Sequence, residues 1–341
     1  MKTAVVILNW NGLKMLEAYL PVVVLHSGSS VDIIVIDNAS ADGSVEFIKE
    51  KFPDIELIQH KENLGFAGGY NEGLKQLEGR YHYYILLNSD VEVSENWIAP
   101  NIQFMDKNPS VAVCQPKIMS ITNKKCFEHA GAAGGFIDIY GYPFCRGRIF
   151  QHVEEDTGQY DSNREIFWAS GSCFFIRSTA FHTVGGFDAD FFAHMEEIDL
   201  CWRLKAQGHN IIYISNTSVY HVGGGSLPRS NPQKTYLNFR NVLLMLLKNL
   251  PLKTLYPVLF VKLILDGIAG IKFLAEGDIK DFFAVIRAHK SFYSMFSAFK
   301  QKRKDGEQKE VSQIYQASIV FEHFVKRKKR FSQLNIKSPA S

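Results

Sequence analysis

The sequence predicts an α/β protein in which a mostly parallel central sheet carries helices on both faces. Short apolar runs suited to buried strands recur between helical patterns: "AVVIL" (4–8), "IIVI" (33–36), "IELI" (55–58), "YILL" (84–87) and "VAVC" (111–114). Strands that alternate with helices are typical of βαβ units and a parallel sheet. A strongly apolar stretch at 242–275 adds a C-terminal helical extension to this prediction.

Composition narrows the class of protein. The 341 residues are 46% hydrophobic and 21% charged, which is ordinary for a soluble globular chain and excludes disordered and collagen-like classes. The five cysteines include no CxxC pair, so a reducing compartment is favoured over a disulfide framework. We interpret the N-terminal apolar run as a first strand rather than a signal peptide, and expect a cytoplasmic protein.

Charge is unevenly distributed along the chain. Residues 300–341 hold eleven Lys or Arg against four Asp or Glu, although the whole chain carries only +3. Charged residues interrupt the apolar stretch before this tail, which excludes a membrane-spanning helix. The apolar stretch and the tail have two interpretations of equal weight. The stretch forms amphipathic helices that lie on the anionic inner face of the cell membrane, or it forms a helical cap on the core that is followed by a solvated basic tail.

Polar or glycine-rich loops follow each of the first four predicted strands. They read "NWNG", "DNASADGS", "HKENLGFAGGYNEG" and "NSD". In open α/β sheets ligands bind at the carboxyl ends of the strands, so we expect these loops to converge on one crevice. The chain contains neither a GxGxxG that opens a helix after the first strand nor a GxxxxGK[ST], so a nucleotide would be held without a glycine phosphate loop.

Two of these loops have both a binding and a structural interpretation. Asp37 could accept hydrogen bonds from a base or ribose, but "DNAS" followed by "DGS" is equally a helix-capping turn, and the residues alone favour capping. The glycines of "NLGFAGGYNEG" (63–73) could admit a ligand close to the backbone, or simply form a tight turn into a helix.

Asp90 and His221 are candidate metal ligands. A carboxylate at the end of a buried strand, after Asn88 and Ser89, is a hard oxygen ligand for Mg²⁺ or Mn²⁺, although the same residues also suit an ordinary turn. His221 lies in "YHVGGGS" (220–226). A lone histidine is more often structural than a ligand, but the neighbouring glycines favour close approach of a ligand.

The segment "MEEIDLCWR" (195–203) predicts the start of a helix that carries several acidic residues. Asp199 and Arg203 are four residues apart and should pair, with Glu196 on the same face, which indicates a structural role. Glu197 points elsewhere and could face a cleft as a general base. The alternative is that these carboxylates only complement the helix dipole.

Together these motifs resemble a known family. The matching stretches span residues 4–249: "VVILNWNG", "IDNASADGS", "NLGFAGGYNEG", "LLNSD", "WASGSCFFIR", "GGFDADFFAHMEEIDLCWR", "YHVGGGS" and "FRNVLLMLLKN". In this order they are similar to the family-2 inverting glycosyltransferases of the GT-A (Rossmann-like) fold. Within that family they resemble the rhamnosyltransferase-like branch of bacterial cell-surface glycan enzymes.

The resemblance implies a role for each motif. "NSD" looks like a DXD motif that keeps only its last carboxylate, and Glu197 occupies the position of the usual aspartate base. The donor-binding residues would be Asn9, Asn11, Asp37, Asn38, Asn63, Gly65, Gly68, Asn71, Asn88, Ser89 and Asp90. The acceptor side would include Gly171 and Glu196, the metal ligands would be Asp90 and His221, and the base would be Glu197.

The implied reaction moves a sugar from a nucleoside-diphosphate sugar, of UDP or dTDP type, to a glycan or lipid-linked glycan, with Mg²⁺ or Mn²⁺ and no nucleic-acid partner. The rival interpretations are a nucleotidyltransferase on a similar sheet and a non-catalytic binding module of the same fold. We expect a nucleotide-sugar-binding half at 1–95, an acceptor-binding and catalytic half at 96–230, C-terminal helices at 231–300 and a basic tail at 301–341.

Overall fold

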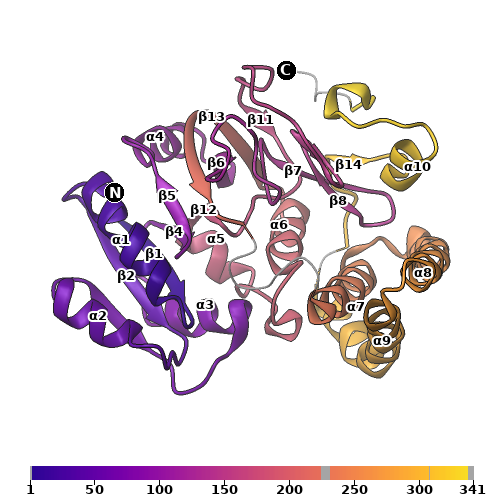
Figure 1. Ribbon diagram of the computed structural model, residues 1–341, viewed down its shortest axis with the longest axis horizontal. Coiled ribbons are helices and arrows are strands. Elements are labelled where there is room, and N and C mark those ends of the chain that lie inside the picture. Colours follow the sequence, from indigo (N-terminus) through magenta and orange to yellow (C-terminus); the bar gives the residue numbers. More distant parts are fainter. Residues whose placement is uncertain (1, 224–230, 307, 337–341) are drawn as a thin grey trace.

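The computed structural model describes residues 2–223, 231–306 and 308–336, and Figure 1 shows how their elements are arranged. Gly224 to Ser226 of the "YHVGGGS" motif and the last five residues of the predicted tail lie outside the described residues.

A large, twisted sheet forms the centre of the molecule. Its strands are β1 (Thr3–Asn9), β2 (Val31–Asp37), β3 (Glu56–Gln59), β4 (Tyr83–Asn88), β5 (Val91–Val93), β6 (Val111–Ser120), β11 (Arg164–Glu165), β12 (Cys173–Arg177) and β13 (Asn210–His221). The spatial order is β11-β13-β6-β12-β4-β1-β2-β3, and β5 pairs with β13. β1, β2, β3 and β4 are mutually parallel, as are β6 and β13, whereas β12 is antiparallel to both of its neighbours. The predicted α/β fold is confirmed.

Helices cover both faces of this sheet because its central strands are apolar on both sides. The helices α1 (Leu13–Ser27), α2 (Ser44–Lys51) and α4 (Ala99–Lys107) pack on one face, and α3 (Gly65–Lys75), α5 (Ser178–Thr183) and α6 (Glu196–Ala206) on the other. Along β1, Val5 and Ile7 belong to the hydrophobic core under α1, α2 and α4, and Ala4 and Val6 belong to the core under α3, α5 and α6. The two halves expected on either side of 95/96 share this one sheet, because β12 from the second half pairs with β4 from the first.

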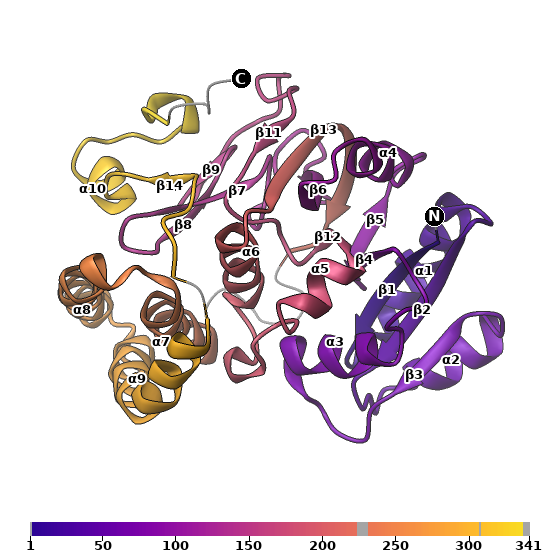
Figure 2. The same ribbon diagram turned by 180° about the vertical axis from the view of Figure 1, so that it is seen from behind.

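A smaller sheet lies beside the large one (Figure 2). It consists of β7 (Gly135–Asp138), β8 (Pro143–Cys145), β9 (Arg148–Ile149), β10 (His152–Val153) and β14 (Ile314–Tyr315), in the order β10-β9-β8-β7-β14. β14 comes from the segment expected as a basic tail, which also forms α10 (Ile319–Phe324). Phe331 then packs on Phe136 with ring centroids 5.0 Å apart, so this segment contributes to the core.

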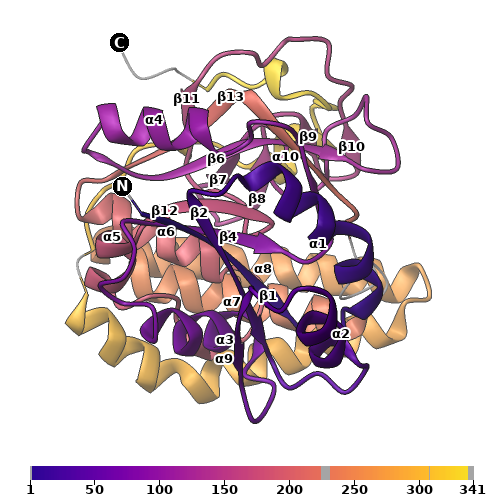
Figure 3. The same cartoon turned by 90° about the vertical axis from the view of Figure 1, so that its left-hand side faces the viewer.

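Three helices form the predicted C-terminal extension, which is confirmed. They are α7 (Pro232–Asn249), α8 (Leu252–Ala275) and α9 (Ile279–Asp305). Figures 1 and 2 show them grouped at the end of the molecule away from β1–β3, with α7 next to α6. Figure 3 shows α8 and α9 running across the molecule. Within the described ranges, none of the helices combines the length and the apolar character needed to cross a membrane.

Candidate active site

The polar loops predicted to converge do so, because their strands are neighbours in register. Asn9 at the end of β1 lies opposite Asp37 at the end of β2, and the preceding Leu8 lies opposite Asn88 at the end of β4. The carboxyl ends of these parallel strands therefore form one edge that carries three of the predicted donor-binding residues.

Asp37 is fixed by hydrogen bonds at this edge. Asn9 Nδ2 donates to Asp37 Oδ2 (3.2 Å) and to Ser40 Oγ (3.1 Å), and the Ser40 amide donates to Asp37 Oδ1 (2.9 Å). Asn11 Oδ1 accepts from the Ala41 amide at 2.8 Å, which joins the first loop to the second. The helix-capping interpretation of "DNAS" is wrong, because Asp37 and Ser40 close a local turn, whereas the N-cap of α2 is Gly43 and has no side-chain cap hydrogen bond. The turn holds Asp37, which is 2% exposed, in one orientation.

The second loop is tied to the third by Asn38. Its Nδ2 donates to Asn63 Oδ1 (2.9 Å) and to the Gly65 carbonyl (3.0 Å), and its Oδ1 accepts from the Leu64 amide (3.1 Å). Gly65 has a φ of +72°, and a Cβ there would lie 2.6 Å from the ring of Phe192. Glycine is therefore required at this position by the backbone and by packing, whatever binds beside it.

Two further predicted donor residues lie on α3. Asn71 Nδ2 donates to the Phe187 carbonyl (2.7 Å), and the Phe187 amide donates to Asn71 Oδ1 (2.9 Å). Both polar ends of Asn71 are thus engaged within the chain and fasten α3 to the segment before α6. A Cβ on Gly68 would lie 3.1 Å from Leu64 Cβ, so space is limited there as well.

Asp90 and His221, which are far apart in the sequence, meet beyond the end of β4. Asp90 lies in the turn between β4 and β5, and the antiparallel pairing of β5 with β13 places His221 opposite Val91. His221 Nε2 lies 3.1 Å from Asp90 Oδ1. The amide of Val222 donates to the Asp90 carbonyl at 3.1 Å, which fixes the turn against the strand.

Glu128 joins this pair and was not predicted. Its Oε2 lies 3.5 Å from His221 Nδ1, and the Glu128 side chain is 6% exposed. Burial alone would lower the pKa of His221, but hydrogen bonds and charges from Asp90 and Glu128 raise this pKa to about 10. Two buried carboxylates around one imidazole thus create a site that attracts positive charge.

Once His221 has lost its extra proton, the donor set of this cluster fits a hard divalent cation. A carboxylate oxygen and an imidazole nitrogen 3.1 Å apart have the separation of neighbouring ligands on an ion with bonds of about 2.1 Å. In the parts of the chain that the structure describes, no group of three or more His, Cys, Asp or Glu is arranged to hold a metal. Asp90 and His221 would therefore share the ion with phosphate oxygens and water, as is usual for Mg²⁺.

The loop before β12 lies between this cluster and α6. The Ser172 carbonyl accepts from the Asn88 amide at 3.1 Å, and the thiol of Cys201 on α6 bonds to the backbone of Ala169. Gly171, predicted on the acceptor side, is buried, and a Cβ there would lie 3.0 Å from the ring of Phe66. The loop thus connects the end of β4, which carries Asn88, to α6.

The three carboxylates at the start of α6 have different environments. The predicted pair is confirmed, with Arg203 Nε 2.8 Å from Asp199 Oδ2. Glu196 is 4% exposed, and burial together with the charge of Glu197 raises its pKa well above the ordinary value. Glu197 is partly exposed, and burial raises its pKa to about 7. Glu197 is the least buried of the three, but its Oε2 is a buried oxygen without a hydrogen-bond partner among the described residues.

Asp199 anchors α6 to α7. Its Oδ1 accepts from Asn249 Nδ2 at 2.8 Å, and its Oδ2 lies 3.0 Å from Lys248 Nζ. Burial would raise its pKa, but Lys248, Arg203 and Asn249 outweigh this effect and lower the pKa to about 2. A fully buried carboxylate with two cations is a structural centre, as the sequence indicated for Asp199.

The loop that leads into α6 is strained and held by α7. Phe192, His194 and Met195 have φ of 64°, 69° and 75°, which is costly for residues with side chains. Asn241 Nδ2 donates to the carbonyls of Phe191, Ala193 and His194, with distances between 2.7 and 3.0 Å. Asn241 lies in "FRNVLLMLLKN", the motif that the resemblance included without assigning a role.

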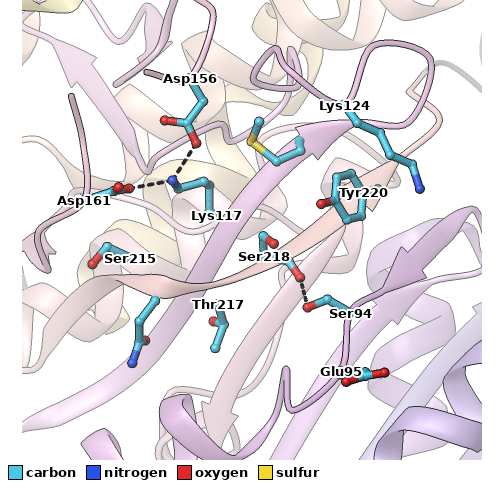
Figure 4. A pocket seen from close by; sticks show the side chains of 12 residues that line it. Ser94, Glu95, Lys117, Lys124, Asp156, Asp161, Ser215, Thr217, Ser218 and Tyr220 are labelled. Atoms are coloured by element: carbon cyan, nitrogen blue, oxygen red, sulfur yellow. Dashed lines mark hydrogen bonds and ion pairs between the residues drawn. The ribbon is translucent and has the colours of Figure 1, made fainter. Parts of the chain in front are cut away.

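A hollow on the molecule is lined by residues other than these (Figure 4). Its volume is about 470 Å³, and it is lined by Ser94, Glu95, Lys117, Met119, Lys124, Asp156, Asp161, Ser215, Asn216, Thr217, Ser218 and Tyr220. Lys117 Nζ pairs with Asp156 (2.5 Å) and Asp161 (2.6 Å) at one end. Tyr220 precedes His221 on β13, and successive strand side chains point to opposite faces, so this hollow does not open on the Asp90–His221 pair.

A mostly parallel sheet with polar loops at the carboxyl ends of its strands occurs in several classes of α/β protein, among them the GT-A class of glycosyltransferases. Comparison with known proteins distinguishes between these classes: residues 4–185, more than half of the chain, match the family described as Glycosyl transferase family 2, and the chain belongs to this family. It is a glycosyltransferase, and the nucleotidyltransferase alternative is not favoured.

Individual proteins related to the chain by sequence have low identity to it. The chain is 26% identical over 219 residues to N-acetylglucosaminyl-diphospho-decaprenol L-rhamnosyltransferase of Mycobacterium tuberculosis (strain CDC 1551 / Oshkosh). This match covers 60% of the present chain and 71% of that protein. The rhamnosyltransferase-like resemblance inferred from the motifs is therefore confirmed.

Solved structures show the same fold. S. aureus TarS 1-349 in complex with UDP-GlcNAc has a TM-score of 0.55 at 13% identity, covering 89% of this chain and 92% of that one. GalNAc-T7 with UDP, GalNAc and Mn²⁺ has a TM-score of 0.55 at 17% identity, covering 73% of this chain and 48% of that one. The chain thus spans about half of GalNAc-T7, and a protein of this fold holds a divalent metal.

The role of Asp199 gives a first prediction. Asp199→Asn leaves Lys248 and Arg203 buried with one carboxylate fewer, so we expect a loss of about 3 to 5 kcal/mol in the free energy of unfolding at pH 7. The loss should shrink as the pH falls from about 4 towards 2. Folding lowers the pKa of Asp199 to about 2, so its carboxylate stabilises the folded state fully above the pKa of the unfolded chain, and this stabilisation disappears as the pH falls through the folded-state pKa.

Urea unfolding at several pH values measures this effect. Asp190→Asn is the matched control, since Asp190 pairs with Lys302 but is 48% exposed in its side chain, and it should cost less than about 1 kcal/mol. If Asp199→Asn leaves the unfolding free energy unchanged but removes turnover, Asp199 takes part in the chemistry instead.

Proposed function

We propose that the chain is an inverting glycosyltransferase that moves a sugar from a UDP- or dTDP-sugar to a hydroxyl of a lipid-linked glycan in cell-surface glycan assembly. The observation that carries this proposal is the meeting of Asp90 and His221 at the carboxyl edge of the sheet. The acceptor class is suggested by the name of the mycobacterial relative, whose substrate is a sugar on a lipid diphosphate. Such an acceptor would place the reaction at the inner face of the cell membrane.

The donor is proposed to lie along the edge formed by the first four strands. Asp37 and Asn9 would face the nucleoside, and the segment from Asn63 to Asn71 would lie near the ribose and phosphates. Asn11, Asn38, Gly65, Gly68, Asn88 and Ser89 would complete this surface. Because Asn38 and Asn71 use their side-chain amides within the chain, their contribution would be to hold the loops in place.

Asp90 and His221 would hold Mg²⁺ or Mn²⁺ against the diphosphate. When bound, such an ion stabilises the negative charge that develops on the departing nucleoside diphosphate. Glu128 lies 3.5 Å from the other ring nitrogen of His221, so its charge would favour the ring orientation that directs Nε2 at Asp90. Glu128 is thus a positioning residue for the metal ligand.

Glu197 is proposed to remove the proton of the acceptor hydroxyl. The hydroxyl oxygen attacks the anomeric carbon as the bond to the diphosphate oxygen breaks, and the proton passes to the Glu197 carboxylate. A single displacement from the opposite face inverts the anomeric centre. Gly171 and the buried Glu196 would border the acceptor side.

The proposed function is tested by measuring nucleotide release from a panel of UDP-, dTDP- and GDP-sugars with Mg²⁺ or Mn²⁺. We expect release with a UDP- or dTDP-sugar, and the metal that supports it identifies the cofactor. Tight donor binding without release or transfer, with a lipid-linked acceptor present, would instead favour the non-catalytic binding module.

A second prediction concerns the base. Glu197→Gln should lower kcat by about 10²- to 10⁴-fold while the donor Kd stays unchanged, because a base acts on the acceptor proton. In the unchanged chain, kcat should fall about tenfold per pH unit below about 7, since Glu197 must be ionised and its pKa is raised to about 7. Steady-state kinetics against pH and donor calorimetry measure both effects.

Glu196→Gln is the matched control for this prediction. If Glu196→Gln loses turnover without unfolding while Glu197→Gln keeps it, the base is Glu196 and the assignment must change.

A third prediction concerns the metal. Glu128→Gln should weaken Mn²⁺ binding about 10- to 100-fold, because it alters the carboxylate that orients the ligand His221. Asp90→Ala should weaken binding further, because it removes a ligand. Electron paramagnetic resonance of Mn²⁺ in the presence of UDP reads binding directly, without turnover.

Glu92→Gln serves as the control in the metal experiment, since Glu92 lies on the neighbouring strand and pairs with Lys124 instead of His221. Equal Mn²⁺ affinity for Glu128→Gln and Glu92→Gln would show that Glu128 does not position a metal ligand.

A further inference from the structure

The helix α8 has its polarity reversed relative to a helix that faces water. Its two central charged residues, Lys262 and Asp266, are 2% and 0% exposed. Its large apolar residues are exposed by 49% to 67% instead, at Leu252, Tyr256, Phe260, Ile264, Ile268, Ile271 and Leu274. Successive members of this set are three or four residues apart and therefore lie along one side of the helix, which we call the α8 ridge.

The buried charges of Lys262 and Asp266 have partners inside the protein. Lys262 Nζ pairs with Asp266 and lies 4.4 Å from the ring centre of Tyr142. His289 Nε2 on α9 lies 3.4 Å from the other Asp266 oxygen, and the Tyr142 hydroxyl donates to Asp266 at 3.4 Å. The inner side of α8 therefore packs on the protein through its charged residues, and its outer side is an exposed apolar surface.

The exposed apolar surface continues onto the first half of α9. Ile279, Phe283, Ile286 and Tyr293 are exposed by 48% to 60%. The two helices pack against each other, with Phe282 of α9 lying next to Gly270 of α8. Figures 1 and 2 place them at the outer edge of the molecule, at the end opposite to β1–β3.

The charges around this surface are mainly positive. From 252 to 297 the exposed basic residues are Lys253, Lys272, Lys280, Arg287 and Lys290, against Glu276 and Asp278. Lys253 pairs with Glu310 and Lys272 with Glu276, so the positive charge of this surface rests on Lys280, Arg287 and Lys290. A second copy of the chain docked on this surface would bring two basic rims together, which is unfavourable. A bilayer that contains anionic lipids matches both the apolar ridge and the basic rim.

We propose that the α8 ridge and the neighbouring surface of α9 lie in the interface of an anionic lipid bilayer, with α8 parallel to the membrane plane. The proposal goes beyond the transfer reaction, and it deepens the proposed lipid-linked acceptor by naming the surface that brings the chain to the acceptor. Tyr256 and Tyr293 suit this depth, because a tyrosine has an apolar ring and a polar tip.

This proposal moves the membrane contact away from the basic tail. Lys302 pairs with Asp188 and, at 2.8 Å, with Asp190, and Arg303 Nη1 donates to the Leu247 carbonyl at 3.2 Å. Further along, Lys326 and Lys328 both pair with the buried Glu322. Several basic side chains of the tail are thus used to fold the tail onto the protein.

The test is flotation of the full chain with vesicles of phosphatidylcholine alone or mixed in equal parts with phosphatidylglycerol. We expect binding to the mixed vesicles at low salt, weaker binding to the neutral ones, and a loss of about tenfold or more for the double substitution Phe260→Ser and Ile264→Ser. Both positions are exposed, so the melting temperature and the donor Kd should stay unchanged.

The matched control is the double substitution Val24→Ser and Leu25→Ser on α1, where the side chains are 40% and 74% exposed, and it should bind like the unchanged chain. Full binding by the α8 variant, or equal binding to both kinds of vesicle, would overturn the proposal. So would a dimer in light scattering that the α8 substitutions dissociate, because the ridge would then be a contact between copies. Donor binding is read separately, so a failure of the proposed function cannot be mistaken for a failure of this one.

Discussion

The buried carboxylate of Asp199 is the interaction on which the arrangement of the catalytic half depends. It draws together Arg203 from its own helix and Lys248 and Asn249 from α7. Because an unpaired charge in this position would be very unfavourable, these groups have little freedom to separate. Arg203 also donates to the carbonyls of Val184 and Gly186, which extends the constraint to the segment that Asn71 fastens to α3. The donor loops, α6 and the C-terminal helices are thus linked through one buried charge.

This constraint explains how a strained loop can hold the carboxylate of Glu197, which we propose as the base. Residues 192, 194 and 195 adopt left-handed backbone conformations, each of which costs roughly 1 to 3 kcal/mol. The strain persists because Asn241 and Arg240 of α7 satisfy the loop carbonyls and α7 is itself fixed by Asp199. The turn before Glu197 is therefore supported by α7 together with α3, whose Phe66 amide donates to the Phe192 carbonyl at 2.9 Å.

The sequence was sufficient for the fold and for the approach of Asp90 to His221, because strand periodicity and ordered motifs encode both. It could not reveal Glu128, whose contact with His221 depends on how the chain after β6 folds back along β6, where the Glu128 amide donates to the Ile118 carbonyl. Nor could it reveal β14, since two residues in a basic segment carry no periodic signal, and their partner strand lies some 180 positions earlier. Asp37 shows a further limit: its residue type suits a helix cap, but its partners are Asn9 of the first loop and the amide of Ser40, and the contact with Asn9 depends on how the two loops are placed.

The apolar stretch at 242–275 shows why composition could not choose between a cap on the core and a surface for lipid. Leu255 and Leu259 are buried against the protein, whereas Phe260 and Ile264 are exposed, although all four are similar in hydropathy. Each interpretation is thus carried by a different side of the same helix. What separates the sides is the position of the charges, because Lys262 and Asp266 face inwards to Tyr142 and His289. Because both central charges of α8 point into the protein, the outer side of its centre is apolar. This property depends on tertiary contacts rather than on residue content.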